Sequence, residues 1–169
     1  MTMKKAFFTI LICSLGIFGF GQTAVECIKY ADENRENQNW PDVIRYCNKG
    51  IELNPSVSWF YWSRGTAKQQ LKDNRGALID FDTAIRLKPG DNPIIYYDRA
   101  VAKCSLKKYN DALPDFDMSI KLMPTKLAYF SRGKIKILLG KKESACLDLS
   151  KAGELGMAEA YELIKKYCN

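Results

Sequence analysis

The sequence contains no histidine, and several motifs that carry common enzyme chemistry are absent with it. Without an imidazole the chain cannot build a Ser-His-Asp triad, a histidine-ligated metal site or a histidine acid–base catalyst. It also has no Cys-x-x-Cys pair, no His-Glu-x-x-His motif and no glycine-rich phosphate loop. We therefore expect a protein that is not an enzyme and that holds no metal or cofactor.

Clustered positive charge is also lacking. The formal net charge is +7, from 26 basic and 19 acidic residues, and acidic residues stand between the lysines along the chain. A nucleic-acid-binding surface would gather its lysines and arginines in one patch or stripe. We therefore expect a solvated charged surface and no nucleic-acid partner, around the packed core that a hydrophobic content of 47% indicates.

Long apolar runs are missing except at the start of the chain. A positively charged beginning, "MTMKK", precedes the apolar stretch "AFFTILICSLGIFGFG", which ends at Gly21. A membrane-spanning helix needs roughly 20 apolar residues, so this stretch is short for a span but fits a signal peptide. We predict a signal peptide over residues 1–21, export to the periplasm, cell envelope or medium, and no membrane insertion after cleavage. An uncleaved N-terminal anchor is the alternative.

In place of catalytic motifs, the sequence contains an internal repeat. The pattern Tyr-x-x-Arg-small-x-x-Lys begins at Tyr61, Tyr96 and Tyr129, with its arginines 35 and 33 residues apart. Prolines recur with nearly the same spacing, at Pro55, Pro89 and Pro124. Self-similarity with a period of about 34 residues indicates a solenoid of stacked helix pairs. In the second unit, the apolar spacing predicts helices over about 57–71 and 75–87.

These residues resemble tetratricopeptide repeats. The small, aromatic and proline positions of that family are occupied in the second unit by Gly65, Ala77, Phe81, Ala84 and Pro89. The third unit has the same kinds of residue, whereas the first and fourth diverge, as terminal repeats often do. The resemblance implies an all-α, right-handed α-solenoid of about four helix-turn-helix units. The domain would cover residues 22–169, with repeats at about 24–57, 58–92, 93–125 and 126–157 and a capping helix at about 158–168.

The repeated arginines replace the leucine that the family usually has. Each unit that carries one also has an aspartate at a matching place in its second helix, and the first unit has neither. We therefore predict three structural ion pairs: Arg64–Asp80, Arg99–Asp115 and Arg132–Asp148. The alternative is a row of three arginines that binds an anionic ligand, although the matched aspartates would neutralise it.

The resemblance also implies a concave groove lined by the first helices of successive units. The groove positions carry many aromatic and aliphatic side chains, which are typical of interaction sites. The predicted partner-binding residues are Trp59, Trp62, Thr66, Gln69, Ile94, Tyr97, Val101, Phe130 and Lys134. A role of these aromatic residues in packing alone is the competing interpretation.

The groove favours an apolar partner over a terminal carboxylate. Some members of the family bind a C-terminal carboxylate with basic residues, but the corresponding positions here are Ile28, Asp32, Ser63, Ile94 and Asp98. We therefore predict a scaffold or adaptor that binds an apolar peptide or protein segment. The alternative is a structural subunit of an envelope complex or a homo-oligomer, with the groove permanently filled.

Five cysteines would remain after cleavage of the signal peptide, at positions 27, 47, 104, 146 and 168. Exported proteins commonly form disulfides, and an odd number leaves at least one thiol unpaired. Cys146 and Cys168 lie at similar distances from the turn between two antiparallel helices, so we predict a disulfide between them. A Cys27–Cys47 bond is a weaker possibility, which would leave Cys104 as the odd thiol.

Overall fold

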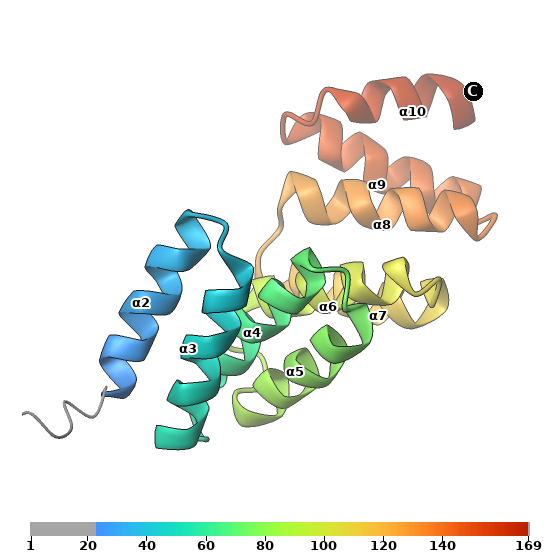
Figure 1. Ribbon diagram of the computed structural model, residues 1–169. Coiled ribbons are helices and arrows are strands. Elements are labelled where there is room, and N and C mark those ends of the chain that lie inside the picture. Colours follow the sequence, from blue (N-terminus) through green and yellow to red (C-terminus); the bar gives the residue numbers. More distant parts are fainter. Residues whose placement is uncertain (1–22, 169) are drawn as a thin grey trace, which may run out of the picture.

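The computed structural model describes residues 23–168, which form nine α-helices and no β-strand (Figure 1). The helices are α2 (Ala24–Glu36), α3 (Trp40–Leu53), α4 (Ser58–Gln70), α5 (Asn74–Leu87), α6 (Pro93–Ser105), α7 (Tyr109–Leu122), α8 (Lys126–Leu138), α9 (Lys142–Glu154) and α10 (Glu159–Tyr167). Each predicted repeat thus contains two helices, and α10 lies where a capping helix was expected. The predicted signal peptide lies outside the described residues.

The helix ends follow from local sequence. The side chains of Thr23, Asp73, Asn92 and Thr125 each accept a hydrogen bond from a backbone N–H in the first turn of a helix. Inside the units, the turn between the two helices needs a residue with positive φ, which is Gly140 in the fourth unit. Glycine suits this conformation because it has no Cβ to clash.

Small residues allow the two helices of a unit to approach each other closely. A Cβ added to Gly65 on α4 would lie 2.7 Å from Cε1 of Phe81 on α5. At Gly133 on α8 it would lie 3.1 Å from Cγ of Leu149 on α9. The glycine of the repeated motif is therefore needed for packing within the unit, and the core consists of such contacts repeated along the chain.

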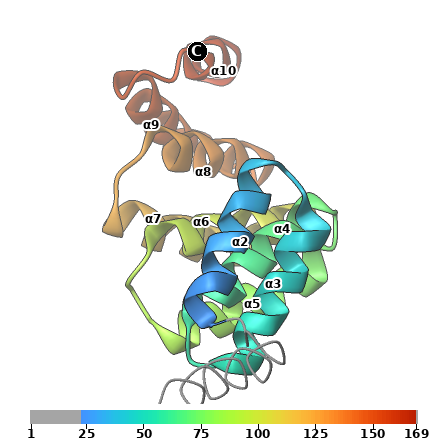
Figure 2. The ribbon, with the colours of Figure 1, turned by 60° about the vertical axis from the view of Figure 1, so that its left-hand side comes forward.

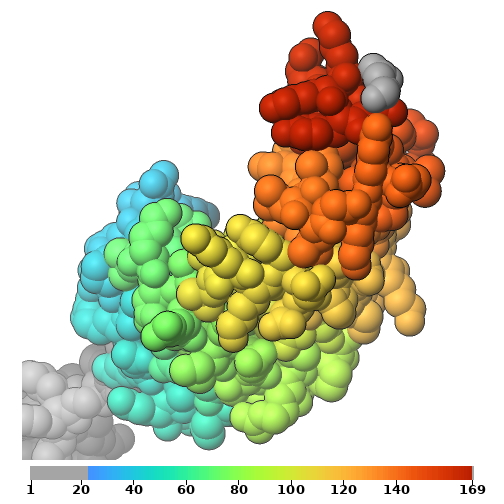
Figure 3. All heavy atoms as spheres, turned by 90° about the vertical axis from the view of Figure 1, so that its right-hand side faces the viewer, coloured from blue at the N-terminus to red at the C-terminus, as the bar shows by residue number. Residues whose placement is uncertain are grey.

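The helix pairs stack into a solenoid that turns along its length. Helices α2 to α7 form one continuous part, and α8, α9 and α10 stand at an angle to it (Figures 1 and 2). Helix α8 makes less contact with α7 than the first helices of the second and third units make with the helices before them. A space-filling view shows a hollowed corner where residues coloured orange meet those coloured yellow and green (Figure 3).

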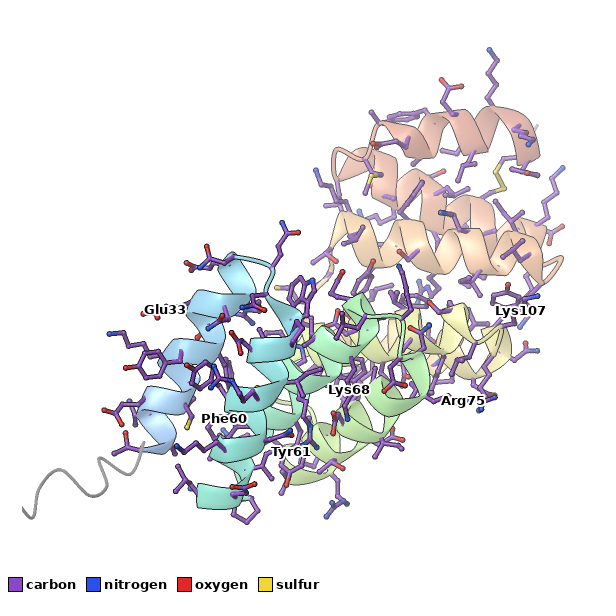
Figure 4. The ribbon with its side chains drawn as sticks, in the orientation of Figure 1. Glu33, Phe60, Tyr61, Lys68, Arg75 and Lys107 are labelled. Atoms are coloured by element: carbon purple, nitrogen blue, oxygen red, sulfur yellow. A yellow bond between two sulfur atoms is a disulfide. The ribbon has the colours of Figure 1, made fainter. Side chains whose placement is uncertain are left out.

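A disulfide fastens the last helix. Cys146 on α9 and Cys168, just after α10, are joined with their Cα atoms 5.8 Å apart, and the bond is visible in yellow in Figure 4. Cys27 and Cys47 are free and buried, so the weaker pairing is wrong in this structure, and Cys104 is also free. Across residues 23–168, no helix has both the length and the apolar character that a membrane span requires.

Candidate functional site

The three motif arginines pair with the three aspartates in the same way. In each pair Nε and Nη2 of the arginine donate to the two carboxylate oxygens, an arrangement that gives two parallel hydrogen bonds. The Nε and Nη2 distances are 3.0 and 2.6 Å for Arg64–Asp80, 2.9 and 2.5 Å for Arg99–Asp115, and 2.8 and 2.6 Å for Arg132–Asp148. The aspartate side chains are only 2, 5 and 6% exposed, so these pairs lie at the core and not on the surface.

The other residues of the repeated motif belong to the same cluster. Its lysines bind the same three carboxylates: Lys68 with Asp80 at 2.8 Å, Lys103 with Asp115 at 2.7 Å and Lys136 with Asp148 at 2.8 Å. The guanidinium carbons lie 5.6, 5.8 and 5.6 Å from the ring centroids of the motif tyrosines. Figure 4 labels Tyr61 and Lys68 of the first such cluster, both from α4.

The arginines also join neighbouring units. Nη1 of Arg99 donates to Asp82 at 2.7 Å, and Nη1 of Arg132 donates to Asp117 at 2.6 Å, each on the second helix of the preceding unit. Nη1 of Arg64 donates to Asn48 at 2.6 Å in the corresponding place. All three nitrogens of each guanidinium are therefore used inside the protein. A ligand anion would have to displace these bonds, so the geometry favours the structural role over the anion-binding alternative.

The groove residues on α4 form two connected groups. Trp59 and Trp62 lie edge to face with ring centroids 6.4 Å apart, and the guanidinium of Arg35 lies 5.2 Å from the Trp62 ring. The other group gathers around Asp98 of α6. Nε1 of Trp62 donates to Oδ2 of Asp98 at 2.8 Å, and Oγ1 of Thr66 lies 3.5 Å from the same oxygen.

Burial changes the acidity of Asp98. It raises the pKa of this carboxyl from 3.8 to about 6, although the hydrogen bonds from Trp62 and Thr66 act in the opposite direction. Among the described residues no lysine or arginine forms an ion pair with Asp98. Asp98 is thus a partly buried acid whose side-chain hydrogen-bond donors are all neutral.

Two hollows meet at Asp98. We call the larger one the apolar hollow; its volume is about 450 Å³, and it lies between α6, the end of α7 and the start of α8. It is lined by Pro93, Ile94, Tyr97, Asp98, Ser119, Met123, Thr125, Lys126 and Leu127. The polar hollow, of about 320 Å³, is lined by Gln69, Gln70, Lys72, Asn74, Tyr97, Asp98, Val101 and Ser105.

The groove residues nearer the C-terminus lie around Tyr97. Its hydroxyl is 3.2 Å from Oγ of Ser131 on α8, and its ring meets that of Phe116 edge to face. A third hollow of about 210 Å³ contains Tyr97, Val101 and Lys134. Farther along α8, Nζ of Lys134 lies 5.4 Å from the ring centroid of Phe130. The predicted groove is therefore a series of half-buried side chains with hollows between them, and it is not one open apolar strip.

The structure adds functional candidates that the sequence analysis did not assign. Asp98 appeared there only as a position where a basic residue was lacking. Its donor Trp62 is 36 residues away in the sequence, so no local pattern could indicate this contact. Met123 also lines the apolar hollow, although it stands in the connection between two units, and Leu127, a groove position of the fourth unit by the family resemblance, lies beside it in the same lining. In residues 23–168, no group of three or more Cys, Asp or Glu side chains is placed to hold a metal ion.

The arrangement of helices is that of the tetratricopeptide-repeat fold. The chain resembles MamA from Desulfovibrio magneticus RS-1, with a TM-score of 0.74 and 19% identity over 82% of this chain and 78% of that one. It also resembles YrrB, described as a TPR protein with an unusual peptide-binding site, with a TM-score of 0.76 and 20% identity over 91 and 78% of the two chains.

A third similar structure contains a peptide. It is the first TPR domain of Spaghetti (RPAP3) bound to the HSP90 peptide SRMEEVD, with a TM-score of 0.67 and 22% identity over 70% of this chain and 97% of that one. No family profile and no curated protein matches the sequence. The similarity to these three structures shows that the protein has an all-α, right-handed solenoid fold of the tetratricopeptide-repeat type.

Proposed function

We propose that this protein is an exported interaction module that binds an apolar peptide or protein segment in the groove formed by α4, α6 and α8. The observation that carries the proposal is the apolar hollow, which opens next to exposed Ile94 and Leu127 and is walled mainly by apolar side chains. Its volume lies in the range of roughly 300–1,000 Å³ that ligand pockets commonly have. Two proteins of the same fold, YrrB and RPAP3, are described with a peptide-binding site or a bound peptide.

Export is supported by two separate features. The first 21 residues have the charged start and apolar run of a signal peptide. The Cys146–Cys168 disulfide is of a kind that persists in oxidising compartments such as the periplasm. Intact mass measurement of the protein isolated from cells should give a chain that begins at Gln22, and a retained N-terminus would mean that the segment serves as an anchor.

The groove can be tested with a matched pair of double variants. Ile94→Ala with Leu127→Ala removes two exposed apolar side chains beside the apolar hollow, which are 44 and 47% exposed. Ile79→Ala with Leu147→Ala removes two even more exposed side chains from the second helices α5 and α9. Because all four side chains are exposed, both double variants should fold as the wild type does.

The mature protein and both variants would be crosslinked in extract of the cells that make it, and the captured partner would be purified for calorimetry. We expect the groove variant to bind about tenfold more weakly, a loss of about 1.4 kcal/mol, and the control variant to bind as the wild type does. The reverse pattern would move the binding site to the second helices. Self-association that rises with the concentration of the pure protein would favour the structural-subunit alternative.

A further inference from the structure

We propose that Asp98 is the recognition site for a single lysine side chain of the bound segment, with the alkyl part of that lysine in the apolar hollow. This inference rests on the proposed function, because it describes what the groove recognises and not merely that it binds. It commits to a partner segment that is apolar except for one lysine.

The carboxylate has one oxygen engaged and one open. Both hydrogen bonds to the side chain of Asp98, from Trp62 and Thr66, reach Oδ2. Among the described residues nothing donates to Oδ1, and Oδ1 is not one of the fully buried atoms that lack a partner. It is therefore accessible from the hollows that Asp98 lines. The Thr66 hydroxyl, which also lies 3.1 Å from the carbonyl oxygen of Trp62, is the weaker donor, so Trp62 mainly holds Oδ2 in place and Oδ1 is left as an acceptor for a ligand.

The walls around Asp98 suit the two parts of a lysine side chain. Ile94, Tyr97 and Leu127 offer apolar surface in the same hollow as the carboxylate. A lysine has a four-carbon stem that packs on apolar surface and a charged end that seeks a polar partner. An ammonium is a compact charge that needs only one acceptor, whereas an arginine fork favours both oxygens of a carboxylate. The bond from Trp62 to Oδ2 leaves Oδ1 as the freer oxygen, an arrangement that favours a compact ammonium over an arginine fork.

The neighbouring charges do not neutralise Asp98. Lys126 of α8 lines the apolar hollow, but its Nζ lies 3.4 Å from the carbonyl oxygen of Gly156, in the turn before α10. Lys72, in the turn after α4, lines the polar hollow and makes no ion pair with Asp98. Asn74 of α5 and Ser119 of α7, which line these two hollows, are uncharged. A partner lysine would thus be the first cation to pair with this acid.

The lysine site can be tested with a display library of random twelve-residue peptides. The library would be selected in parallel on the mature wild-type protein and on the Asp98→Asn variant. Asparagine keeps the size of the side chain and an oxygen that can accept a hydrogen bond from Trp62. Circular dichroism would first establish that the two proteins are equally helical. We expect a lysine at a fixed position among apolar residues in the wild-type selection and no such preference in the selection on the variant.

A synthetic peptide with the consensus sequence then tests the contribution of the lysine charge to binding. Norleucine in place of the lysine keeps the stem and removes the ammonium. We expect this change to weaken binding to the wild type about tenfold and binding to Asp98→Asn less than twofold, so that the two changes are coupled. The lysine peptide should also bind the wild type more weakly at pH 5 than at pH 7.5, since the pKa of Asp98 is raised to about 6 by burial. The ammonium of the peptide lysine keeps its charge over this range.

The possible results separate this inference from the proposed function. Selected peptides without a fixed lysine, equal loss with norleucine on both proteins, or arginine as frequent as lysine would overturn the lysine site. If those peptides still lose affinity for the Ile94→Ala, Leu127→Ala protein, the groove remains a binding site and only its specificity is wrong. Failure to select any peptide on the wild type would overturn both.

Discussion

At the scale of single residues, the partly buried Asp98 differs from the three buried acids of the repeated motif. Asp80, Asp115 and Asp148 each face an arginine and a lysine, whereas Asp98 has only Trp62 and Thr66 as side-chain donors. Burial without a cation penalises the charged form of a carboxyl group. A buried carboxyl group without a cationic partner therefore lowers the stability of the fold at neutral pH. Residues that serve binding commonly have such a destabilising environment.

The first prediction follows from the pKa of Asp98. Because the folded protein holds this proton more tightly (pKa raised to about 6 by burial) than an unfolded chain would (ordinary value 3.8), protonated Asp98 stabilises the fold. That stability is fully present below about pH 4 and is lost as the pH rises through 6. At pH 7.5 Asp98→Asn should therefore raise the free energy of unfolding, by at most about 3 kcal/mol at 1.36 kcal/mol per unit of pKa.

Urea unfolding of both proteins at pH 7.5, 6 and 4.5 checks this prediction. The advantage of Asp98→Asn should shrink as the pH falls, because the wild type then gains the protonated acid. Asp91→Asn changes an exposed acid and serves as the control, with a small effect that varies little with pH. A variant less stable than the wild type at pH 7.5 would show that the bonds to Trp62 and Thr66 outweigh the cost of burial.

At the scale of helices, the repeated motif joins three elements at a time. Arg99 on α6 binds Asp115 on α7 of its own unit and Asp82 on α5 of the unit before. Arg132 on α8 makes the equivalent bonds to α9 and α7. The first unit has no arginine at the corresponding position, and Tyr30 and Tyr46 stack there with ring centroids 5.2 Å apart. The motif therefore holds the two helices of its own unit and the second helix of the unit before in fixed positions relative to one another.

The second prediction compares the two acids bound by Arg99. Asp115→Asn leaves Arg99 and Lys103 facing a neutral group at a side chain that is 5% exposed, and should cost about 3 kcal/mol of stability. Asp82→Asn removes the charge of a side chain that is 62% exposed and keeps an oxygen that can accept from Arg99, as Asn48 does for Arg64, so it should cost less than about 1 kcal/mol. Chemical denaturation measures both values.

A double-mutant cycle separates the pair from its surroundings. Arg99→Leu restores the leucine that tetratricopeptide repeats usually have at this place, and we expect a coupling energy with Asp115→Asn of about 1–3 kcal/mol. Additive losses from the two substitutions would mean that their interaction adds nothing to stability, despite the bidentate geometry.

Most of the helical architecture could be predicted from the sequence, because its signals are local and periodic. The second unit was expected to have helices over about 57–71 and 75–87, and they run from Ser58 to Gln70 and from Asn74 to Leu87. Arg99 and Asp115 could be matched because they recur together in three units. Lys103 was part of the recognised pattern but was given no partner, since spacing alone does not show which acid a flexible side chain reaches.

The groove was harder to predict because its properties depend on how successive units are oriented. Ile94 was expected to line an open surface and is 44% exposed. The hollow beside it lies between α6, the end of α7 and the start of α8. Helix α8 stands at an angle to α6 and α7 (Figure 2), and this angle could not be predicted from the residue pattern. Asp98 lies where these orientations meet, so its isolation from cations could be seen only in three dimensions.

At the scale of the whole molecule, most contacts run between consecutive helices along the solenoid, and a smaller number join the first helices of successive units, as Trp62 and Asp98 do. In such a fold stability is a sum of units and of the interfaces between them, so separate parts can open separately. The interface between α7 and α8 is the thinnest of those between units. Helices α8, α9 and α10 should therefore behave as a cooperative part of their own, which the Cys146–Cys168 bond holds closed at its far end.

The third prediction tests that division. Cys168→Ser removes the disulfide between α9 and α10, whose cysteines are 22 residues apart, and should destabilise the C-terminal part by about 3 kcal/mol on a chain-entropy estimate. Hydrogen exchange measured by mass spectrometry should become faster in α8, α9 and α10, while α2 to α5 keep the protection of the wild type. Cys104→Ser, at a free thiol in the middle of the solenoid, is the control. Faster exchange throughout the chain would mean that the solenoid unfolds as one unit, and that α8 is fastened to α7 as firmly as the other helices are to one another.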